Sequence, residues 1–131
     1  MTDENGQKNA REEAARGAEA LAAARILLAG GFFNDAVSRA YYAAFHWARA
    51  LLVSRGIEPR THRGLCQMLG LHFLKTGILS EKAGSDFAHL QTYRELSDYN
   101  SSARFTKKQA MQEVARARRF IAACRPLLRR R

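Results

Sequence analysis

Arg94 and Asp98 have the residue types and the spacing of a helical ion pair or of a phosphate-binding site. Residues four apart on a helix share one face, so the guanidinium and the carboxylate can meet. Phe87 and Leu90 lie two turns and one turn earlier on roughly that face, which would bring the pair close to the core. A guanidinium held rigidly there matches the oxygens of a phosphate group. The alternative, which the local pattern alone favours, is a purely structural salt bridge.

A second row of polar side chains lies about fifty residues earlier, where Ser38, Tyr42, His46 and Arg49 recur at intervals of four, four and three. This spacing places them on one helix face, beside an apolar stripe. The row is a candidate for chemistry because it combines a phenol, an imidazole and a guanidinium. The alternative is a helix flank at the edge of the core, with Tyr42 and His46 half buried and satisfied by their neighbours.

Familiar catalytic and cofactor-binding motifs are missing from the sequence. It contains neither a GxxxxGK[ST] nor a GxGxxG nucleotide loop, and it contains no HExxH metal motif. His62 and His72 flank a short predicted helix, and nothing pairs them into a metal site. Cys66 and Cys124 form no CxxC motif, which argues against a disulfide framework and a structural zinc site. We therefore expect no cofactor and no metal.

The basic charge is concentrated at the C-terminal end. The chain has a net charge of +10, and residues 104–131 hold ten basic residues against the single acid Glu113. The other 103 residues are nearly balanced, with 12 basic and 11 acidic side chains. A basic end of this kind suits contact with nucleic acid or with an acidic partner protein, and Arg116, Arg118 and Arg119 are the candidate phosphate contacts. The alternative is a solvated helix face that ends in a frayed arginine tail.

The length and composition fit one domain. A chain of 131 residues with 47% apolar residues can build one core, and it has no room for a second, regulatory domain. We expect a single domain over 1–131, with a polar segment at about 1–8 and an Arg-rich tail at about 125–131. No apolar run reaches the length of a membrane span, and the first 24 residues do not resemble a signal peptide, so we expect a cytoplasmic protein without a membrane partner.

Helical periodicity and capping residues predict five helical segments and no strands. The predicted segments cover 8–29, 34–55, 61–73, 80–99 and 106 to near the C-terminus. Gly30 and Gly31 are expected to end the first helix, and Asn34 is expected to cap the second. Thr106 and Gln109 fit the capping box of the last helix. Both prolines, Pro59 and Pro126, are expected between or beyond the helices.

Two apolar stripes are expected to face the core of this bundle. The second helix carries one stripe at helical spacing, formed by Val37, Tyr41, Ala44, Ala48 and Leu51. The last helix carries the other, formed by Ala110, Val114, Ala117, Ile121 and Cys124. The sequence therefore predicts an all-α fold, a four- to five-helix up-and-down bundle.

Four stretches of the chain resemble the HEPN-domain proteins, and in particular a small stand-alone prokaryotic subfamily. The similar segments, in the order of the subfamily, are 38–52 (SRAYYAAFHWARALL), 61–65 (THRGL), 72–77 (HFLKTG) and 94–99 (RELSDY). Each motif is moderately specific, and together they cover about residues 20–123. The resemblance implies a helical bundle that forms a homodimer.

The resemblance also implies a metal-independent endoribonuclease site. In this family the site pairs an arginine with a histidine four to six residues later, and two protomers bring their motifs together at a dimer cleft. Stand-alone members are often toxins encoded beside a minimal nucleotidyltransferase, and in some pairs this antitoxin transfers AMP onto a tyrosine near the motif. Here Arg94 matches the motif arginine, but Tyr99 stands where a histidine is expected and no histidine follows Arg94. Tyrosine is a poor base at pH 7, because its reference pKa is about 10.

We therefore hold two hypotheses from the sequence. In the first, the protein is the toxin-like member of a pair with a minimal nucleotidyltransferase antitoxin, and Arg94 binds an RNA or nucleotide phosphate at the dimer cleft. The predicted catalytic residues are Arg94, Asp98, Tyr99 and His46, where His46 requires that the second helix faces Arg94. The predicted phosphate or RNA contacts are Arg39, Tyr42, Arg94, Arg116, Arg118 and Arg119. In the second hypothesis, the protein is a non-catalytic module that binds RNA or nucleotide, or docks a partner.

Overall fold

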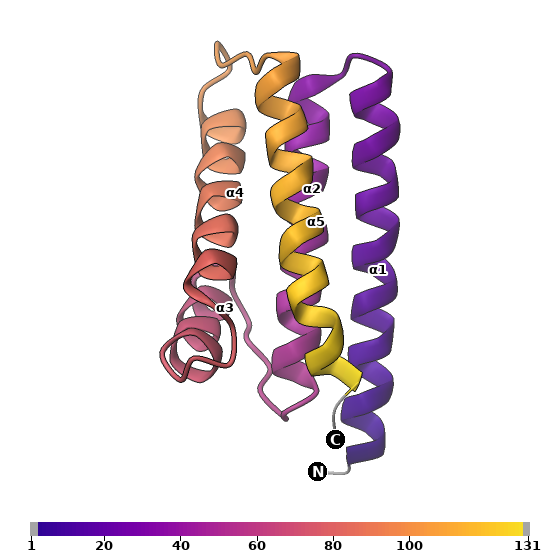
Figure 1. Cartoon of the computed structure of the whole chain (residues 1–131), viewed down its shortest axis with the longest axis vertical. Helices are drawn as coiled ribbons and strands as arrows, with labels where there is room; N and C mark the ends of the chain where they lie inside the picture. The colour runs from indigo at the N-terminus through magenta and orange to yellow at the C-terminus, as the bar shows by residue number, and fades with distance from the viewer. Residues whose placement is uncertain (1–2, 130–131) are drawn as a thin grey trace.

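The computed structural model describes residues 3–129, which form five α-helices with no strand among them. The helices are α1 (Asp3–Ala29), α2 (Phe33–Val53), α3 (His62–Leu69), α4 (Glu81–Tyr99) and α5 (Lys107–Arg129). In Figure 1 the four long helices run in alternating directions, with α5 in front of α2 and with α1 and α4 on either side. The predicted all-α up-and-down bundle is confirmed.

Side-chain caps fix where three of the helices begin. Thr106 and Gln109 form the expected capping box, because the Gln109 N–H donates to Thr106 Oγ1 (3.1 Å) and the Thr106 N–H donates to Gln109 Oε1 (2.9 Å). Ser80 accepts from the Ala83 N–H at the start of α4. Thr61 accepts from the Gly64 N–H at the start of α3. The Thr61 cap matters for function because it places the next residue, His62, at the first position of α3.

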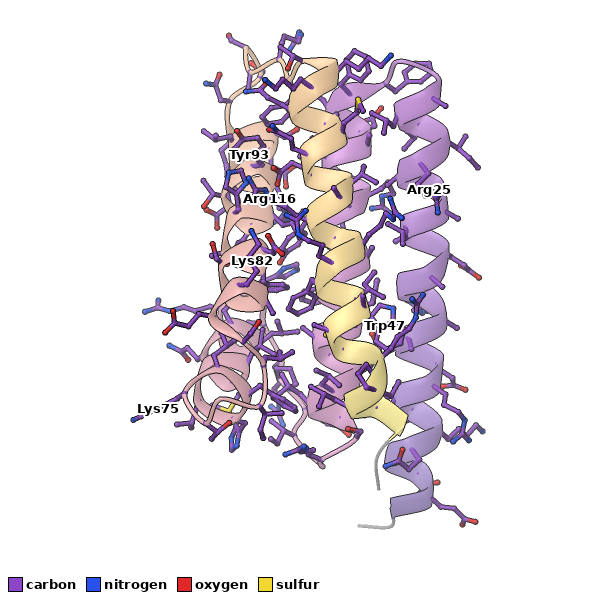
Figure 2. The ribbon with its side chains drawn as sticks, in the orientation of Figure 1. Arg25, Trp47, Lys75, Lys82, Tyr93 and Arg116 are labelled. Carbon is purple, nitrogen blue, oxygen red and sulfur yellow. The ribbon has the colours of Figure 1, made fainter. Side chains whose placement is uncertain are left out.

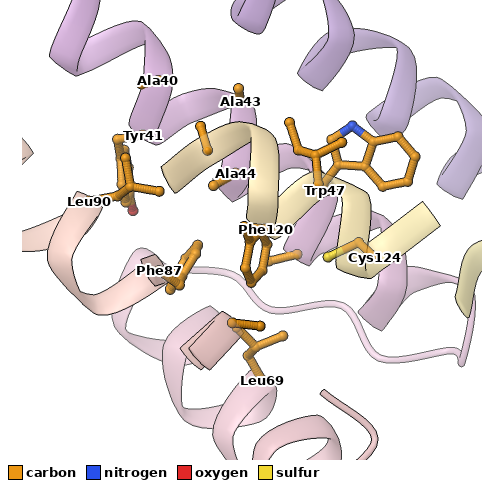
Figure 3. Close-up of a cluster of buried hydrophobic side chains, with 14 of the residues drawn as sticks. Ala40, Tyr41, Ala43, Ala44, Trp47, Leu69, Phe87, Leu90, Phe120 and Cys124 are labelled. Carbon is orange, nitrogen blue, oxygen red and sulfur yellow. The ribbon is translucent and has the colours of Figure 1, made fainter. Parts of the chain in front are cut away.

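The core forms around α2, whose side chains meet α1, α4 and α5. All five residues of the predicted α2 stripe are buried, and so are all five of the predicted α5 stripe. Figure 3 shows Phe87 of α4 against Phe120 of α5, and their ring centroids are 5.2 Å apart. Tyr41 of α2 is fully buried in the same cluster. Because Tyr41 carries a hydroxyl into the core, its position requires a hydrogen-bond partner.

Helix α1 packs closely against α2 because a glycine faces the only tryptophan. A Cβ atom added at Gly17 would lie 2.6 Å from Cδ1 of the Trp47 indole, closer than side chains tolerate. The Trp47 ring also meets α5, because the Arg125 guanidinium carbon lies 5.8 Å from the ring centroid. Trp47 thus lies between the two helices that flank α2, as Figure 2 shows.

The structure corrects two predictions about helix ends. Asn34 does not cap α2, because the helix already begins at Phe33. Asn34 instead ties the loop before α5 to α2, donating to the Ala103 carbonyl (3.0 Å) and accepting from the Phe105 N–H (3.0 Å). Pro126 lies inside α5 rather than beyond it. It lies in the last turn of α5, so the backbone hydrogen bond that a proline cannot donate is lost only near the end of the helix.

Smaller differences concern the two ends of the chain. Helix α1 begins at Asp3, so most of the polar segment predicted at about 1–8 is helical. Helix α5 continues to Arg129, and the rest of the predicted tail, Arg130 and Arg131, lies outside the described residues. A π-helical turn, Gly70–Leu74, extends α3 over the end of the predicted 61–73 helix. No helix within residues 3–129 is long and apolar enough to cross a membrane.

Candidate functional site

Arg94 and four other side chains, which come from three helices in all, form a group that we call the Arg94 cluster. Tyr41 and Tyr42 come from α2, His62 begins α3, and Arg94 and Asp98 lie one turn apart on α4. The cluster is held by packing as well as by polar contacts, because Tyr41 lies in the core beneath it. A site of this construction is preorganised, since its side chains come from rigid helices.

Arg94 is restrained by three neighbouring side chains, two tyrosines and an aspartate. Its Nη2 donates to the Tyr42 hydroxyl (3.1 Å), and its guanidinium carbon lies 5.4 and 5.6 Å from the Tyr41 and Tyr42 ring centroids. Its Nε lies 2.8 Å from Asp98 Oδ2, but this N–H has no well-aligned hydrogen-bond acceptor in the described part of the chain. Burial opposes the charge, yet Tyr42 and Asp98 outweigh it and raise the pKa of Arg94. Arg94 therefore stays a cation.

His62 is the residue that the sequence analysis missed. Its Nδ1 lies 2.8 Å from the Tyr41 hydroxyl, and its ring stacks on Phe45 with centroids 4.5 Å apart. Burial lowers the pKa of His62, and the nearby Arg94 charge lowers it further. Burial raises the pKa of Tyr41, so its hydroxyl stays protonated. The structure thus brings a neutral imidazole to a fixed cation, although the two residues are 32 positions apart in sequence.

Arg39 joins this site, whereas Tyr99 stands outside it. The Arg39 guanidinium carbon lies 5.0 Å from the Tyr42 ring centroid, so two guanidinium groups flank one tyrosine. The Asp98 side chain is 37% exposed, and the Tyr99 residue is 81% exposed. No hydrogen bond or ring contact ties Tyr99 to the Arg94 cluster within the described residues. The predicted roles of Asp98 and Arg39 remain geometrically possible, while Tyr99 is placed as an accessible neighbour.

The row predicted on α2 divides between two faces of the helix bundle. Tyr42 belongs to the Arg94 cluster, as described above. His46 instead pairs with Glu13 of α1, with 2.9 Å between Nδ1 and Oε1, and Arg49 Nε lies 3.3 Å from the other oxygen of the same carboxylate. Within one chain, His46 is therefore held by α1, and no hydrogen bond or ion pair within residues 3–129 joins it to Arg94.

Two of the three predicted phosphate contacts on α5 are paired inside the protein. Arg119 donates twice to Asp86 of α4, at 3.0 and 3.2 Å, and Arg116 donates to Glu113 at 3.0 Å and to Asp86 at 3.5 Å. Both carboxylates are buried, with Asp86 only 1% exposed and Glu113 fully enclosed. Figure 2 shows Arg116 between α5 and α4. The buried acids balance these two cations, so the structure does not support the prediction that Arg116 serves phosphate. Arg118 makes no ion pair among residues 3–129.

The residues described here offer no obvious metal site. No group of three or more histidine, cysteine, aspartate or glutamate side chains is arranged to hold an ion within residues 3–129. Glu113 is paired with both Arg116 and His89, whose Nδ1 lies 3.0 Å from the carboxylate. The Arg94 cluster offers a guanidinium that can bind an anion and an imidazole that can transfer a proton.

The sequence pattern of the HEPN domain family matches residues 10–127, and the chain therefore belongs to this family. It is 36% identical over 103 residues to "Putative toxin MJ0605" of Methanocaldococcus jannaschii, covering 79% of this chain and 76% of that protein. It is 40% identical over 79 residues to a UPF0332 protein of Pyrococcus horikoshii, covering 60% of this chain and 56% of that protein. A second M. jannaschii protein, "Putative toxin MJ0142", is 32% identical over 92 residues, with coverages of 70% and 63%. The chain thus spans less than two thirds of the latter two relatives.

Proposed function

We propose that this protein is a toxin-like HEPN protein that binds an RNA phosphate at the Arg94 cluster and cleaves the strand without a metal. The observation that supports this proposal most directly is that a fixed guanidinium and a neutral imidazole, those of Arg94 and His62, both contact Tyr41. The names of the two toxin relatives support the toxin-like role. An antitoxin partner follows from that role, and the family resemblance points to a minimal nucleotidyltransferase.

The proposed reaction uses the 2′-hydroxyl of RNA as the nucleophile. His62 takes the proton from this hydroxyl through Nε2 while the O2′–P bond forms and the P–O5′ bond breaks. Arg94 stabilises the charge that develops on the phosphate oxygens. The departing O5′ takes up a proton from water, which balances the proton that His62 has accepted. This step requires the tautomer in which the Nδ1–H of His62 donates to the Tyr41 hydroxyl oxygen, and Nε2 then has a free lone pair and no hydrogen bond in the described structure.

Two variants and one control variant test this function. We expect expression of the wild type without its antitoxin to slow growth and to fragment RNA. Arg94→Ala and His62→Gln should both abolish these effects, whereas Arg11→Ala, an exposed arginine on α1, should not. Thermal midpoints measured in parallel separate a lost site from a lost fold. Intact RNA and normal growth with folded wild-type protein would refute the nuclease proposal.

A non-catalytic RNA- or nucleotide-binding module remains the second candidate. The observation in its favour is that Tyr99, rather than a histidine, follows Arg94 at the family spacing and is 81% exposed. In that case Arg94→Ala would weaken RNA binding, and the wild type would leave RNA intact.

A further inference from the structure

A groove between α1 and α5 collects arginine side chains away from the Arg94 cluster. It has a volume of about 560 Å³, and four of its lining residues are arginines, namely Arg25, Arg118, Arg119 and Arg125. Figure 2 shows Arg25 on α1 pointing toward α5. The remaining lining is small or aliphatic. We call this feature the α1–α5 groove, and it shares no residue with the Arg94 cluster.

Three of these arginines carry charge that the protein does not balance. Arg119 is neutralised by Asp86 on its α4 side. Arg25, Arg118 and Arg125 make no ion pair within residues 3–129, and no acidic side chain lines the groove. Arg125 is held in place by its contact with the Trp47 ring. Converging cations with no acid between them raise the local positive potential, and an anion that enters the groove relieves their repulsion.

The lining indicates which anion fits best. Planar guanidinium groups bind phosphate oxygens through two parallel hydrogen bonds. Arg118 and Arg125 are two turns apart on α5, which is about 10 Å along the axis, so together they suit a ligand with successive phosphates. The groove offers no aromatic ring or amide that could read a base. Contacts between arginine and phosphate position a strand without reading its sequence. It also lacks the aromatic and methionine anchors that are typical of protein interfaces.

We propose that the α1–α5 groove binds the phosphodiester backbone of single-stranded RNA, independently of base sequence. The ligand class rests on the proposed function, but the site does not, because the groove and the Arg94 cluster use different residues. The groove would then hold the strand while Arg94 and His62 act on one phosphate. Inorganic polyphosphate has the same chemistry and is the competing source of the ligand.

The test measures RNA binding as a function of salt with a probe that cannot be cleaved. The probe is a fluorescent 2′-O-methyl oligouridine, which lacks the 2′-hydroxyl nucleophile, and binding is followed by anisotropy between about 50 and 200 mM salt. The groove variant combines Arg25→Gln, Arg118→Gln and Arg125→Gln. A control variant removes the same total charge from exposed sites outside the groove, through Lys8→Gln, Arg11→Gln and Lys75→Gln. All six side chains are exposed, and helical circular dichroism confirms that both variants fold.

We expect the groove variant to lose about two units of slope in log affinity against log salt, since each of three phosphate contacts contributes about 0.7. The control variant should keep the wild-type slope, and polyglutamate should not displace the probe. An unchanged slope in the groove variant would overturn the proposal, as would an equal loss in the control. Displacement by polyglutamate would assign the groove to an acidic protein, and binding of polyphosphate but not RNA would assign it to that anion. Arg94→Ala keeps the groove, so failure of cleavage and failure of this slope test remain distinguishable.

Discussion

His62 resists protonation because its surroundings already carry positive charge. Burial and the Arg94 guanidinium both lower its pKa, while Tyr41 contacts only one of its two ring nitrogens. At neutral pH a histidine with a lowered pKa is unprotonated, so it is available to accept a proton during a reaction. The same property has a consequence for stability that does not depend on the proposed reaction.

The pKa of His62 predicts how the stability of the protein changes with pH. The unfolded chain has the ordinary histidine pKa of about 6.5, and the folded chain a lower value. Between the two values the unfolded state binds more protons, so the free energy of unfolding falls as pH drops through that window. Urea denaturation at pH about 7.5 and about 5 should show a smaller loss for His62→Gln than for the wild type. Equal losses would mean that His62 does not resist protonation.

At the scale of the helix, α5 carries its arginines on two flanks with different roles. The flank toward α4 pairs Arg116 and Arg119 with buried carboxylates, whereas the flank toward α1 presents Arg118 and Arg125 to a groove. The sequence indicates a basic helix but does not distinguish these flanks, because Arg118 and Arg119 are neighbours in the chain. The charge that is available to a partner is therefore smaller than the composition suggests.

The buried ion pairs between α4 and α5 should contribute measurably to stability. Burial alone would raise the pKa of Asp86, but Arg119, Lys82 and Arg116 outweigh it and lower the pKa. Hydrogen bonds to charged groups contribute about 1.5–3 kcal/mol, so Asp86→Ala should lower the free energy of unfolding by about 2 kcal/mol. Lys82→Ala, which removes a 65% exposed partner, should stay within about 0.5 kcal/mol of the wild type.

The pH dependence of these variants provides a further check. The folded pKa of Asp86 is depressed, so its contribution is complete above the unfolded value of about 3.9 and is lost as pH falls through the folded value. The stability difference between the wild type and Asp86→Ala should therefore shrink in strong acid. A difference that persists there would attribute the loss to packing rather than to charge.

Helices could be predicted from the sequence more completely than the site. Periodic apolar positions and the caps at Ser80 and Thr106 are local signals, so the five helices lie within a few residues of their predicted bounds. Asn34 was predicted to cap α2 because asparagine is a common N-cap residue. The sequence alone does not show that the helix already begins at Phe33. His62 was missed because its proximity to Arg94 arises only when α3 and α4 both pack against α2, where each residue contacts Tyr41. Sequence spacing carries no information about such a contact.

At the scale of the whole molecule, the C-terminal part of α4 exposes large side chains. Leu96 is 46% exposed and Tyr99 is 81% exposed, on the helix that also carries Arg94. Exposed apolar side chains mark an interface where they form a contiguous patch. A symmetric homodimer would bury these side chains and bring two Arg94 clusters to one cleft.

We therefore expect a charged residue on this face to separate the protomers. Light scattering should give a dimer mass for the wild type and a monomer mass for Leu96→Glu, because an unpaired carboxylate is costly to bury. Leu71→Glu changes a side chain that is 51% exposed on the π-helical turn beyond α3, and it should leave the mass unchanged. A monomer mass for the wild type at micromolar concentration would remove the shared cleft from the proposed function.

Trp47 gives this protein a built-in optical reporter. It is the single tryptophan of the chain, and its indole lies between α1 and α5, in contact with the guanidinium of the groove residue Arg125. Indole emission responds to a neighbouring cation and to the polarity of its surroundings. An anion that draws Arg125 away from the ring therefore changes the indole fluorescence, whereas the Arg94 cluster contains no tryptophan. Ligand entry into the groove can thus be followed in unlabelled protein.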